Sequence, residues 1–264
     1  MTPDTIEWTV DVAADVLLTA EASRTDRHPL SDDWPDLDLD IAYDVQHALI
    51  ARKVAAGEKI VGVKLGLTSR AKQDRMGIAS PLTAWLTDWM VLEADVPIPT
   101  DQLIHPRVEP EIVFVLGERL MGPGVTAASA LAAVRSVYAG LEVIDSRYTD
   151  FRFTLPDVVA DNASSSRFVV GSVERRPTDL DLMLEACVLS VNGSVVDSAT
   201  GAAVQGHPAE ALALAANALG ERGVALEPGW IVLTGGLTDA VFVEPGFALS
   251  AEFTHLGSVV VTAR

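Results

Sequence analysis

The sequence predicts an α+β fold in which a helical N-terminal part precedes a strand-rich mixed β core. Up to about residue 57, apolar residues recur mainly at helical spacing. From residue 97 onward, short apolar runs alternate with turn signals, and Asn192-Gly193 between two such runs indicates a hairpin. We therefore expect residues 1–95 to form a helical part packed on the core. Residues 96–264 would form the strand-rich core that carries the functional site, and the two parts can count as one domain.

The individual elements follow from these patterns. Glycines close two of the predicted helices, and Ser69 is a candidate N-cap for a short one. The predicted helices span residues 6–22, 40–56, 69–76, 127–137 and 208–219. The predicted strands span residues 60–67, 107–116, 139–146, 167–173, 184–191, 194–198, 230–234, 241–243, 248–254 and 257–262. In the first strand, Gly62 and Gly66 suggest places where another backbone approaches closely.

The composition excludes several classes of function. The chain of 264 residues carries a formal net charge of −18, which argues against binding nucleic acid or an anionic membrane surface. An anionic substrate is still possible where the site is locally positive. No apolar segment is long enough to cross a bilayer, and the N-terminus lacks the features of a secretory signal. We therefore expect a cytoplasmic location, with the single cysteine, Cys187, as a small buried residue.

Three glutamates lie in apolar segments that are typical of buried strands. Glu109 and Glu111 open the run Ile112–Leu116, and Glu142 lies within residues 141–144. Converging buried carboxylates repel one another and would take up protons unless a cation holds them. Hard oxygen ligands without a nearby His or Cys cluster favour Mg²⁺ or Mn²⁺ over zinc. The alternative is a solvated strand face with no metal.

The spacing of the first two glutamates supports a shared ligand. Residues i and i+2 of a strand point to the same face, so Glu109 and Glu111 can bind one ion. Pro110 between them cannot donate to a β-ladder, which predicts a sheet edge or a bulge at this point.

Other polar residues in apolar surroundings are candidates for chemistry. Lys64 is flanked by apolar residues, and burial would lower the pKa of a lysine and fit it for acid–base work; the alternative is an exposed strand lysine. Residues 158–167 form a loop of small polar residues that can bind an anion or can be a plain turn. Arg167 at its end adds a fixed positive charge suited to a carboxylate.

Further candidates have both a functional and a structural interpretation. Asp145 and Arg147 can form a pair that orients the site or only stabilises the fold, and Arg152 is another cation nearby in sequence. Gly235-Gly236 can bring backbone close to a ligand or can be a tight turn. Asp88 is a polar residue among large apolar ones.

Four of these motifs together resemble the hydratase/decarboxylase family of the fumarylacetoacetate hydrolase superfamily. They lie at residues 62–69, 105–112, 141–147 and 160–166, in the order that this family shows. The family includes 2-hydroxypenta-2,4-dienoate hydratases and 4-oxalocrotonate (2-oxo-3-hexenedioate) decarboxylases. The resemblance covers most of the chain from about residue 40 and implies a core of the fumarylacetoacetase C-terminal type, a β-roll or barrel.

The resemblance also implies roles for individual residues. Glu109, Glu111 and Glu142 match the magnesium ligands, and Lys64 matches the catalytic lysine. Asp88 lies where some members carry an acidic active-site residue. The expected substrate-binding residues are Leu65, Arg147, Ser164, Ser165 and Arg167. We further expect a homo-oligomer and a possible complex with a hydratase of the same pathway.

Within this family, residues 145–158 and 164–167 look closer to the decarboxylases than to the hydratases. The implied substrate is a 2-oxo acid with a 3,4 double bond and a distal carboxylate that leaves as CO2. Such a carboxylate needs a local cation, which Arg147, Arg152 or Arg167 could supply. The alternatives are a hydratase with a monocarboxylate substrate, a non-catalytic partner subunit of a hydratase and, more distantly, an acylpyruvate hydrolase.

Overall fold

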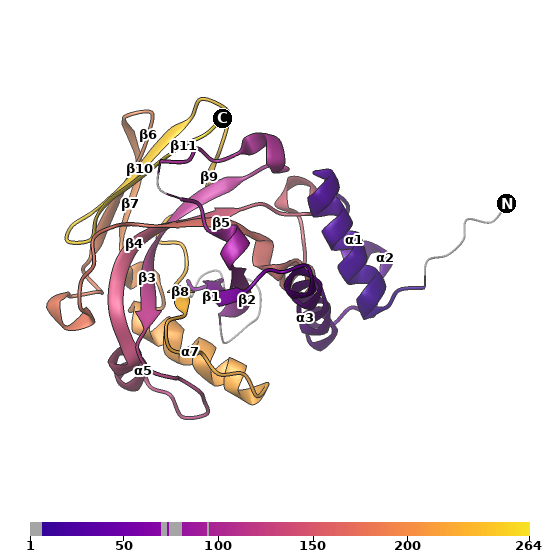
Figure 1. Cartoon of the computed structure of the whole chain (residues 1–264), viewed down its shortest axis with the longest axis horizontal. Helices are drawn as coiled ribbons and strands as arrows, with labels where there is room; N and C mark the ends of the chain where they lie inside the picture. Colours follow the sequence, from indigo (N-terminus) through magenta and orange to yellow (C-terminus); the bar gives the residue numbers. More distant parts are fainter. Residues whose placement is uncertain (1–6, 70–72, 74–80, 94) are drawn as a thin grey trace.

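The computed structural model of the protein describes residues 7–69, 73, 81–93 and 95–264 (Figure 1). The molecule is built around a strongly curled sheet, with the N-terminal helices at one end and a second, smaller sheet at the other. One continuous apolar cluster runs from the N-terminal helices through both sheets. Within the described ranges, no helix is long and apolar enough to cross a membrane.

Side-chain caps fix where the N-terminal helices begin. Thr9 accepts a hydrogen bond from the N–H of Val12 at the start of α1, and Asp38 accepts one from Ile41 at the start of α3. Two long helices, α1 (Val10–Ser23) and α3 (Leu39–Ala55), pack side by side, with the short α2 (Leu30–Asp33) between them in sequence (Figure 1). Their buried residues face each other and the core, as the helical spacing predicts.

The larger sheet has seven strands in the order β2-β1-β8-β3-β4-β5, with β9 also paired to β3. Its strands are β1 (Ile60–Gly66), β2 (Leu82–Thr87), β3 (Arg107–Leu116), β4 (Val134–Ile144), β5 (Ser165–Val170), β8 (Ile231–Leu233) and β9 (Val241–Phe242). The sheet curls so far that its two ends meet. The N–H of Leu92, in the segment that follows β2, donates a hydrogen bond of 2.8 Å to the carbonyl of Phe168 in β5. The concave face of the sheet therefore encloses an interior.

The smaller sheet has the order β11-β10-β6-β7 and lies against β4. Its strands are β6 (Ala186–Val191), β7 (Ser194–Thr200), β10 (Ala248–Phe253) and β11 (Gly257–Thr262). Asn192 and Gly193 join β6 to β7 with positive φ angles of 49° and 79°, so the predicted hairpin is confirmed.

The remaining helices lie in the connections. They are α5 (Ala127–Ala133), α6 (Leu155–Ala160) and α7 (Pro208–Glu221), of which α5 and α7 pack together and α6 contacts α3. Short 3₁₀ turns are η1 (Asp88–Met90), η2 (Thr100–Gln102), η3 (Thr149–Phe151), η4 (Asn162–Ser164), η5 (Pro177–Asp179) and η6 (Gly201–Ala203). The predicted helix over residues 69–76 falls almost wholly outside the described residues.

Among the differences from the sequence-based expectation, two affect the larger sheet. Residues 134–137 were expected to continue a helix, but they begin β4, in which the β-branched side chains of Val134 and Val137 are both buried. The sequence also missed β2, whose six residues are all buried and so lack the alternation of a half-buried strand. Since β1 and β2 both belong to the larger sheet, the helical N-terminal part ends before Ile60 rather than near residue 95.

Gly62 shows why β1 needs a residue without a side chain. A Cβ at this position would lie 1.9 Å from the carbonyl oxygen of Ile231 in the neighbouring β8, a distance no side chain tolerates. The predicted close approach is therefore confirmed at Gly62. It is absent at Gly66, where a Cβ would make only an ordinary contact of 3.7 Å with Leu82.

Candidate active site

The register of the larger sheet places the three glutamates on one face. Glu109 in β3 lies directly opposite Glu142 in β4, and opposite residues of an antiparallel pair share a face. Glu111 follows two residues later on β3 and therefore points to the same side. One carboxylate oxygen from each of the three residues lies within 4.8 Å of the other two.

Lys64 reaches the same face through two strand pairings. It pairs with Leu233 in β8, and Leu233 pairs with Val113, which lies two residues beyond Glu111 in β3. Its Nζ lies 3.1 Å from Glu142 Oε2, and both side chains are almost fully buried. The exposed-lysine and solvated-face alternatives are therefore excluded.

Pro110 lies in the interior of the sheet and not at an edge. It pairs with Leu141 of β4 on one side. On its other side, β9 pairs only with residues 107–108 and β8 only with residues 113–115. The proline lies in the gap between these two pairings, where no neighbouring strand requires an N–H donor. The prediction of an edge or bulge was therefore wrong. Its reason was correct, because Pro110 lies where no N–H donor is needed.

The electrostatics of the cluster call for a cation. Burial, followed by the charges of Glu142 and Glu109, raises the pKa of Glu111 well above its usual range. Glu111 Oε2 accepts a hydrogen bond of 2.7 Å from the N–H of Gly235, whereas its buried Oε1 has no hydrogen-bond partner. An orphaned carboxylate oxygen beside two further carboxylates is what a divalent ion with hard oxygen ligands requires. The donor set therefore fits Mg²⁺ or Mn²⁺.

Lys64 differs from the expectation in the direction of its pKa shift. Burial alone would lower the pKa, but the charges of Glu142, Glu109 and Glu111 together outweigh it, so the pKa is raised. The predicted lowering was wrong because the sequence could not show that all three carboxylates lie beside the lysine. Lys64 therefore sits in the site as an ammonium group with protons to donate.

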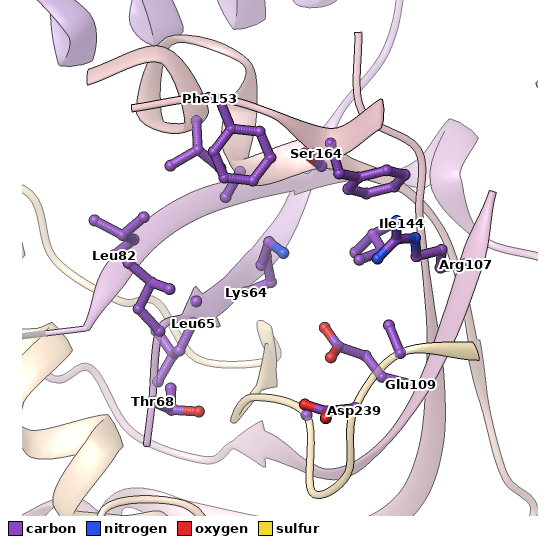
Figure 2. Close-up of a pocket in the computed structure, with 17 residues that line it drawn as sticks. Lys64, Leu65, Thr68, Leu82, Arg107, Glu109, Ile144, Phe153, Ser164 and Asp239 are labelled. Atoms are coloured by element: carbon purple, nitrogen blue, oxygen red, sulfur yellow. The ribbon is translucent and has the colours of Figure 1, made fainter. Parts of the chain in front are cut away.

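Two residues of this cluster, Lys64 and Glu109, line a cavity of about 540 Å³ (Figure 2). Lys64 and Glu109 point into it from β1 and β3, and the predicted binding residues Leu65 and Ser164 also line it. Phe153 and Leu82 add apolar surface to the cavity. The cavity thus combines a polar, acidic wall with apolar walls, as small-molecule sites do.

The loop before β5 holds Ser164 and Ser165 in place through an unusual backbone. Asn162, Ala163 and Ser164 all have positive φ angles, of 47°, 49° and 57°. Asn162 anchors them, since its Oδ1 accepts from the N–H of Trp85 and its Nδ2 donates to the carbonyl of Trp85, both at 2.9 Å. Ser164 then borders the cavity, while Ser165 Oγ donates to Glu142 Oε1 at 3.2 Å. The segment is therefore part of the site rather than a plain turn.

Comparison with known proteins agrees with this site. The model of the fumarylacetoacetate (FAA) hydrolase C-terminal family matches residues 61–264, which include every strand of both sheets except the first residue of β1. The chain belongs to this family. The predicted fold class is confirmed, and the family match begins where the sheet begins.

The similar proteins include both activities of the hydratase/decarboxylase group. A 4-oxalocrotonate decarboxylase of Pseudomonas sp. (strain CF600) is 44% identical over 93% of each chain. A 2-hydroxyhexa-2,4-dienoate hydratase of Comamonas testosteroni is 41% identical over 84% of this chain and 85% of its own. The structure of 4-oxalocrotonate decarboxylase from Pseudomonas putida G7, complexed with magnesium and adipate, is 39% identical with a TM-score of 0.95, covering 98% of this chain and 99% of the other.

Several residues that the sequence analysis assigned to the active site of this protein lie away from the cavity. Arg147 is buried in an ion pair with Asp161, and Arg152 is exposed near Asp32. Arg167 is half-buried and donates to the carbonyl of Ser166 at 2.9 Å. In the described chain, none of these three arginines borders the cavity.

Asp88 also lies away from the cavity. Its Oδ1 accepts a hydrogen bond of 2.9 Å from the backbone N–H of Lys59, at the turn that follows β2. This contact joins the ends of β1 and β2 and gives Asp88 a structural position. Asp88, which the family resemblance had suggested as an acidic active-site residue, therefore does not line the cavity.

Sequence reasoning missed Arg107 and Asp239, which both line the cavity (Figure 2). A signal for Arg107 was present, because it stands two residues before Glu109 in the same strand and therefore shares its face. Asp239 lies in the connection from β8 to β9, for which no periodic pattern predicts an orientation.

The Gly235-Gly236 turn is shaped around the carboxylates. A Cβ at Gly236 would lie 2.2 Å from Glu109 Oε2, and one at Gly235, whose φ is +113°, would lie 2.0 Å from Thr68 Oγ1. Of the two interpretations of this turn, close approach of backbone to the site is therefore correct.

We expect the substitution Gly236→Ala to weaken Mg²⁺ binding by about 10- to 100-fold, the effect typical of disturbing groups that orient metal ligands. The added methyl group would displace the Glu109 carboxylate but would leave both sheets intact. Titration calorimetry with Mg²⁺ measures the affinity, and circular dichroism checks the fold. An unchanged affinity would show that the carboxylate of Glu109 can move aside without loss of binding.

Proposed function

We propose that this protein is a magnesium-dependent carboxy-lyase that converts 4-oxalocrotonate (2-oxo-3-hexenedioate) to 2-hydroxypenta-2,4-dienoate. The observation that carries the proposal is the cluster of three glutamates with the Lys64 ammonium group 3.1 Å from Glu142. Glu109 and Lys64 of this cluster line a cavity with room for a small acid. The high identity to 4-oxalocrotonate decarboxylases over almost the whole chain supports the reaction. Adipate, present in one related structure, has the chain length and two carboxylates of the proposed substrate.

Glu109, Glu111 and Glu142 would hold the Mg²⁺, or alternatively Mn²⁺. When bound, the cation supplies a Lewis acid that polarises the 2-oxo group and makes it an electron sink. Ser165 orients Glu142 through its hydroxyl group, and the N–H of Gly235 orients Glu111. These second contacts fix the carboxylates before the substrate arrives.

Lys64 would manage the proton that the reaction requires. The bond between C5 and C6 breaks, its electron pair moves along the conjugated chain to the C2 oxygen, and C6 leaves as CO2. The C2 oxygen then takes a proton, which completes the dienol. Lys64 Nζ lies beside Glu142 in the same wall and can donate first a hydrogen bond and then a proton to that oxygen.

The other walls would bind the carbon chain. Leu65 and Phe153 provide apolar surface for the conjugated segment, and Ser164 offers a hydroxyl group. Apolar surface around the conjugated segment suits decarboxylation, because it keeps water away from the dienol. A hydratase would instead need a side chain that positions water at the far end of the chain.

The hydratase remains a second candidate because one hydratase relative is 41% identical. A purified protein assay separates the candidates. With Mg²⁺ and 2-oxo-3-hexenedioate we expect CO2 release, loss of activity on adding EDTA, and recovery on restoring Mg²⁺. Water addition to 2-hydroxypenta-2,4-dienoate without CO2 release would identify a hydratase. If neither reaction occurs, the chain is a non-catalytic partner subunit.

The wider setting follows from the chemistry of the product. The proposed product, 2-hydroxypenta-2,4-dienoate, is the substrate named for related hydratases. We therefore infer a place in the meta-cleavage catabolism of aromatic compounds in the cytoplasm, as a homo-oligomer with a hydratase as possible partner. Co-purification of a hydratase with the tagged protein tests the inferred partner. The mass of the purified protein from light scattering tests the inferred homo-oligomer.

A further inference from the structure

Arg107 is a basic residue that lines the cavity and has no role in the mechanism described above. It opens β3 two residues before Glu109, and its side chain extends into the cavity opposite Leu65 and Leu82 (Figure 2). Lys64 is already engaged with Glu142. Among the described residues lining the cavity, Arg107 and Lys64 are the basic ones.

The guanidinium group is held rigidly by two aromatic rings. Its central carbon lies 4.0 Å from the ring centroid of Phe151 and 4.0 Å from that of Phe242. Such a sandwich fixes the plane of the group and removes water from both of its faces. Phe242 is 55% exposed, so the clamp lies near the entrance of the cavity and not in the core.

The hydrogen-bonding capacity of Arg107 is not satisfied within the described chain. Its buried Nε has no hydrogen-bond partner among the described residues. In a chain of net charge −18, a clamped arginine with such an Nε indicates a place for a ligand anion.

The distance along β3 matches the proposed substrate. Arg107 and Glu109 are two residues apart on one face, which corresponds to about 7 Å along a strand. In a six-carbon 2-oxo diacid, four carbon–carbon bonds separate C2 from C6, which places these atoms about 5 Å apart in the extended chain, and the C6 carboxylate oxygens reach about 1 Å further. A guanidinium group also presents paired donors that match a carboxylate.

We propose that Arg107, clamped by Phe151 and Phe242, binds the distal carboxylate of the substrate and so selects dicarboxylic over monocarboxylic 2-oxo acids. This inference rests on the proposed function, because it assumes that the 2-oxo end lies at the three glutamates. It assigns to Arg107 the role for which the sequence had offered Arg147, Arg152 or Arg167. None of those three reaches the cavity.

Two unreactive acids test the inference without turnover. Both 2-oxohexanedioate and 2-oxohexanoate lack the 3,4 double bond, so neither can decarboxylate by the proposed route. In calorimetry with saturating Mg²⁺, the wild-type protein should prefer the diacid. We expect Arg107→Gln to weaken diacid binding by about 10- to 100-fold, because the substitution removes charge-assisted hydrogen bonds to the distal carboxylate. The affinity for the monoacid should change by less than about twofold.

Two further variants sharpen the result. Arg167→Gln is the matched control, because it removes an arginine near the site that does not border the cavity, and it should keep the diacid preference. Phe242→Leu removes one half of the clamp at an exposed position, so it should fold normally and reduce the preference by a smaller factor.

Three outcomes would overturn the inference. They are an equal affinity of the wild-type protein for both acids, an equal loss of both in Arg107→Gln, and loss of the preference in Arg167→Gln. Failure of the proposed function is a separate result, because it appears as absent CO2 release from 2-oxo-3-hexenedioate whatever these binding ratios are.

Discussion

Replacing Glu111 by glutamine is expected to lower magnesium-dependent turnover by at least about 10²- to 10³-fold, the range seen when one preorganised electrostatic partner is removed from a site. Glutamine keeps the shape of the side chain and an oxygen that can accept the hydrogen bond from Gly235. It removes one of the three negative charges that hold the cation. Both the affinity for Mg²⁺ and the rate should therefore fall.

The same substitution should leave the metal-free protein at least as stable as the wild type at neutral pH. Burial and the neighbouring carboxylates raise the pKa of Glu111, so its ionised form is unfavourable in the folded protein. That penalty is full above the raised pKa of the folded state and vanishes below the ordinary pKa of a glutamate. The stability gained by Glu111→Gln should therefore shrink as the pH is lowered.

Denaturant unfolding in EDTA and in Mg²⁺ measures both effects. The wild-type protein should gain stability on adding Mg²⁺, and Glu111→Gln should gain much less. Glu252→Gln on β10 is a matched control, because it changes an exposed strand glutamate outside the site. A Glu111→Gln protein with wild-type turnover and an unchanged response to Mg²⁺ would remove Glu111 from the ligand set.

Replacing Lys64 by methionine should have two separable consequences. Breaking a buried ion pair by removing one partner typically costs about 3–5 kcal/mol, because the remaining charge stays buried without compensation. Here Glu142 would lose the ammonium group at 3.1 Å while Glu109 and Glu111 still repel it. The metal-free variant should therefore be strongly destabilised.

Magnesium distinguishes the structural role of Lys64 from its role in the reaction. A bound cation neutralises the three carboxylates, so saturating Mg²⁺ should recover most of the lost stability. Turnover should stay about 10²- to 10⁴-fold below the wild type, the contribution expected of a positioned acid. Lys59→Met serves as the control, since its side chain is exposed. Full recovery of turnover together with stability would mean that Lys64 only supports the fold.

The sequence predicted the cluster of glutamates because the signals for it lie in short segments of the chain. A glutamate within an apolar run costs free energy unless something holds it, and alternation in a strand places Glu109 and Glu111 on one face. Both arguments need only neighbouring residues. The hairpin at Asn192-Gly193 was predictable for the same reason, because positive φ angles at two adjacent positions have a sequence signature.

The predicted arginines show where local evidence ends. Arg147 was a reasonable candidate for the distal carboxylate, but Asp161, fourteen residues later, occupies its guanidinium group. Arg107 was overlooked. The two phenylalanines that clamp it come from η3 and β9, far from it in sequence, so no local pattern indicated the clamp. Which arginine meets a ligand depends on partners that only the folded chain brings together.

The sequence by itself determined the α+β class, most of the strands, the shared face of Glu109 and Glu111, and the need for a cation. These properties depend on side-chain periodicity and on the cost of burying charge, which act over a few residues. Only the tertiary structure decided how the predicted residues Glu142 and Lys64 meet beside the other two glutamates, that the lysine pKa rises, and that Arg107 faces the cavity. These properties depend on the register between strands distant in sequence, and the curled sheet fixes that register through long-range pairing.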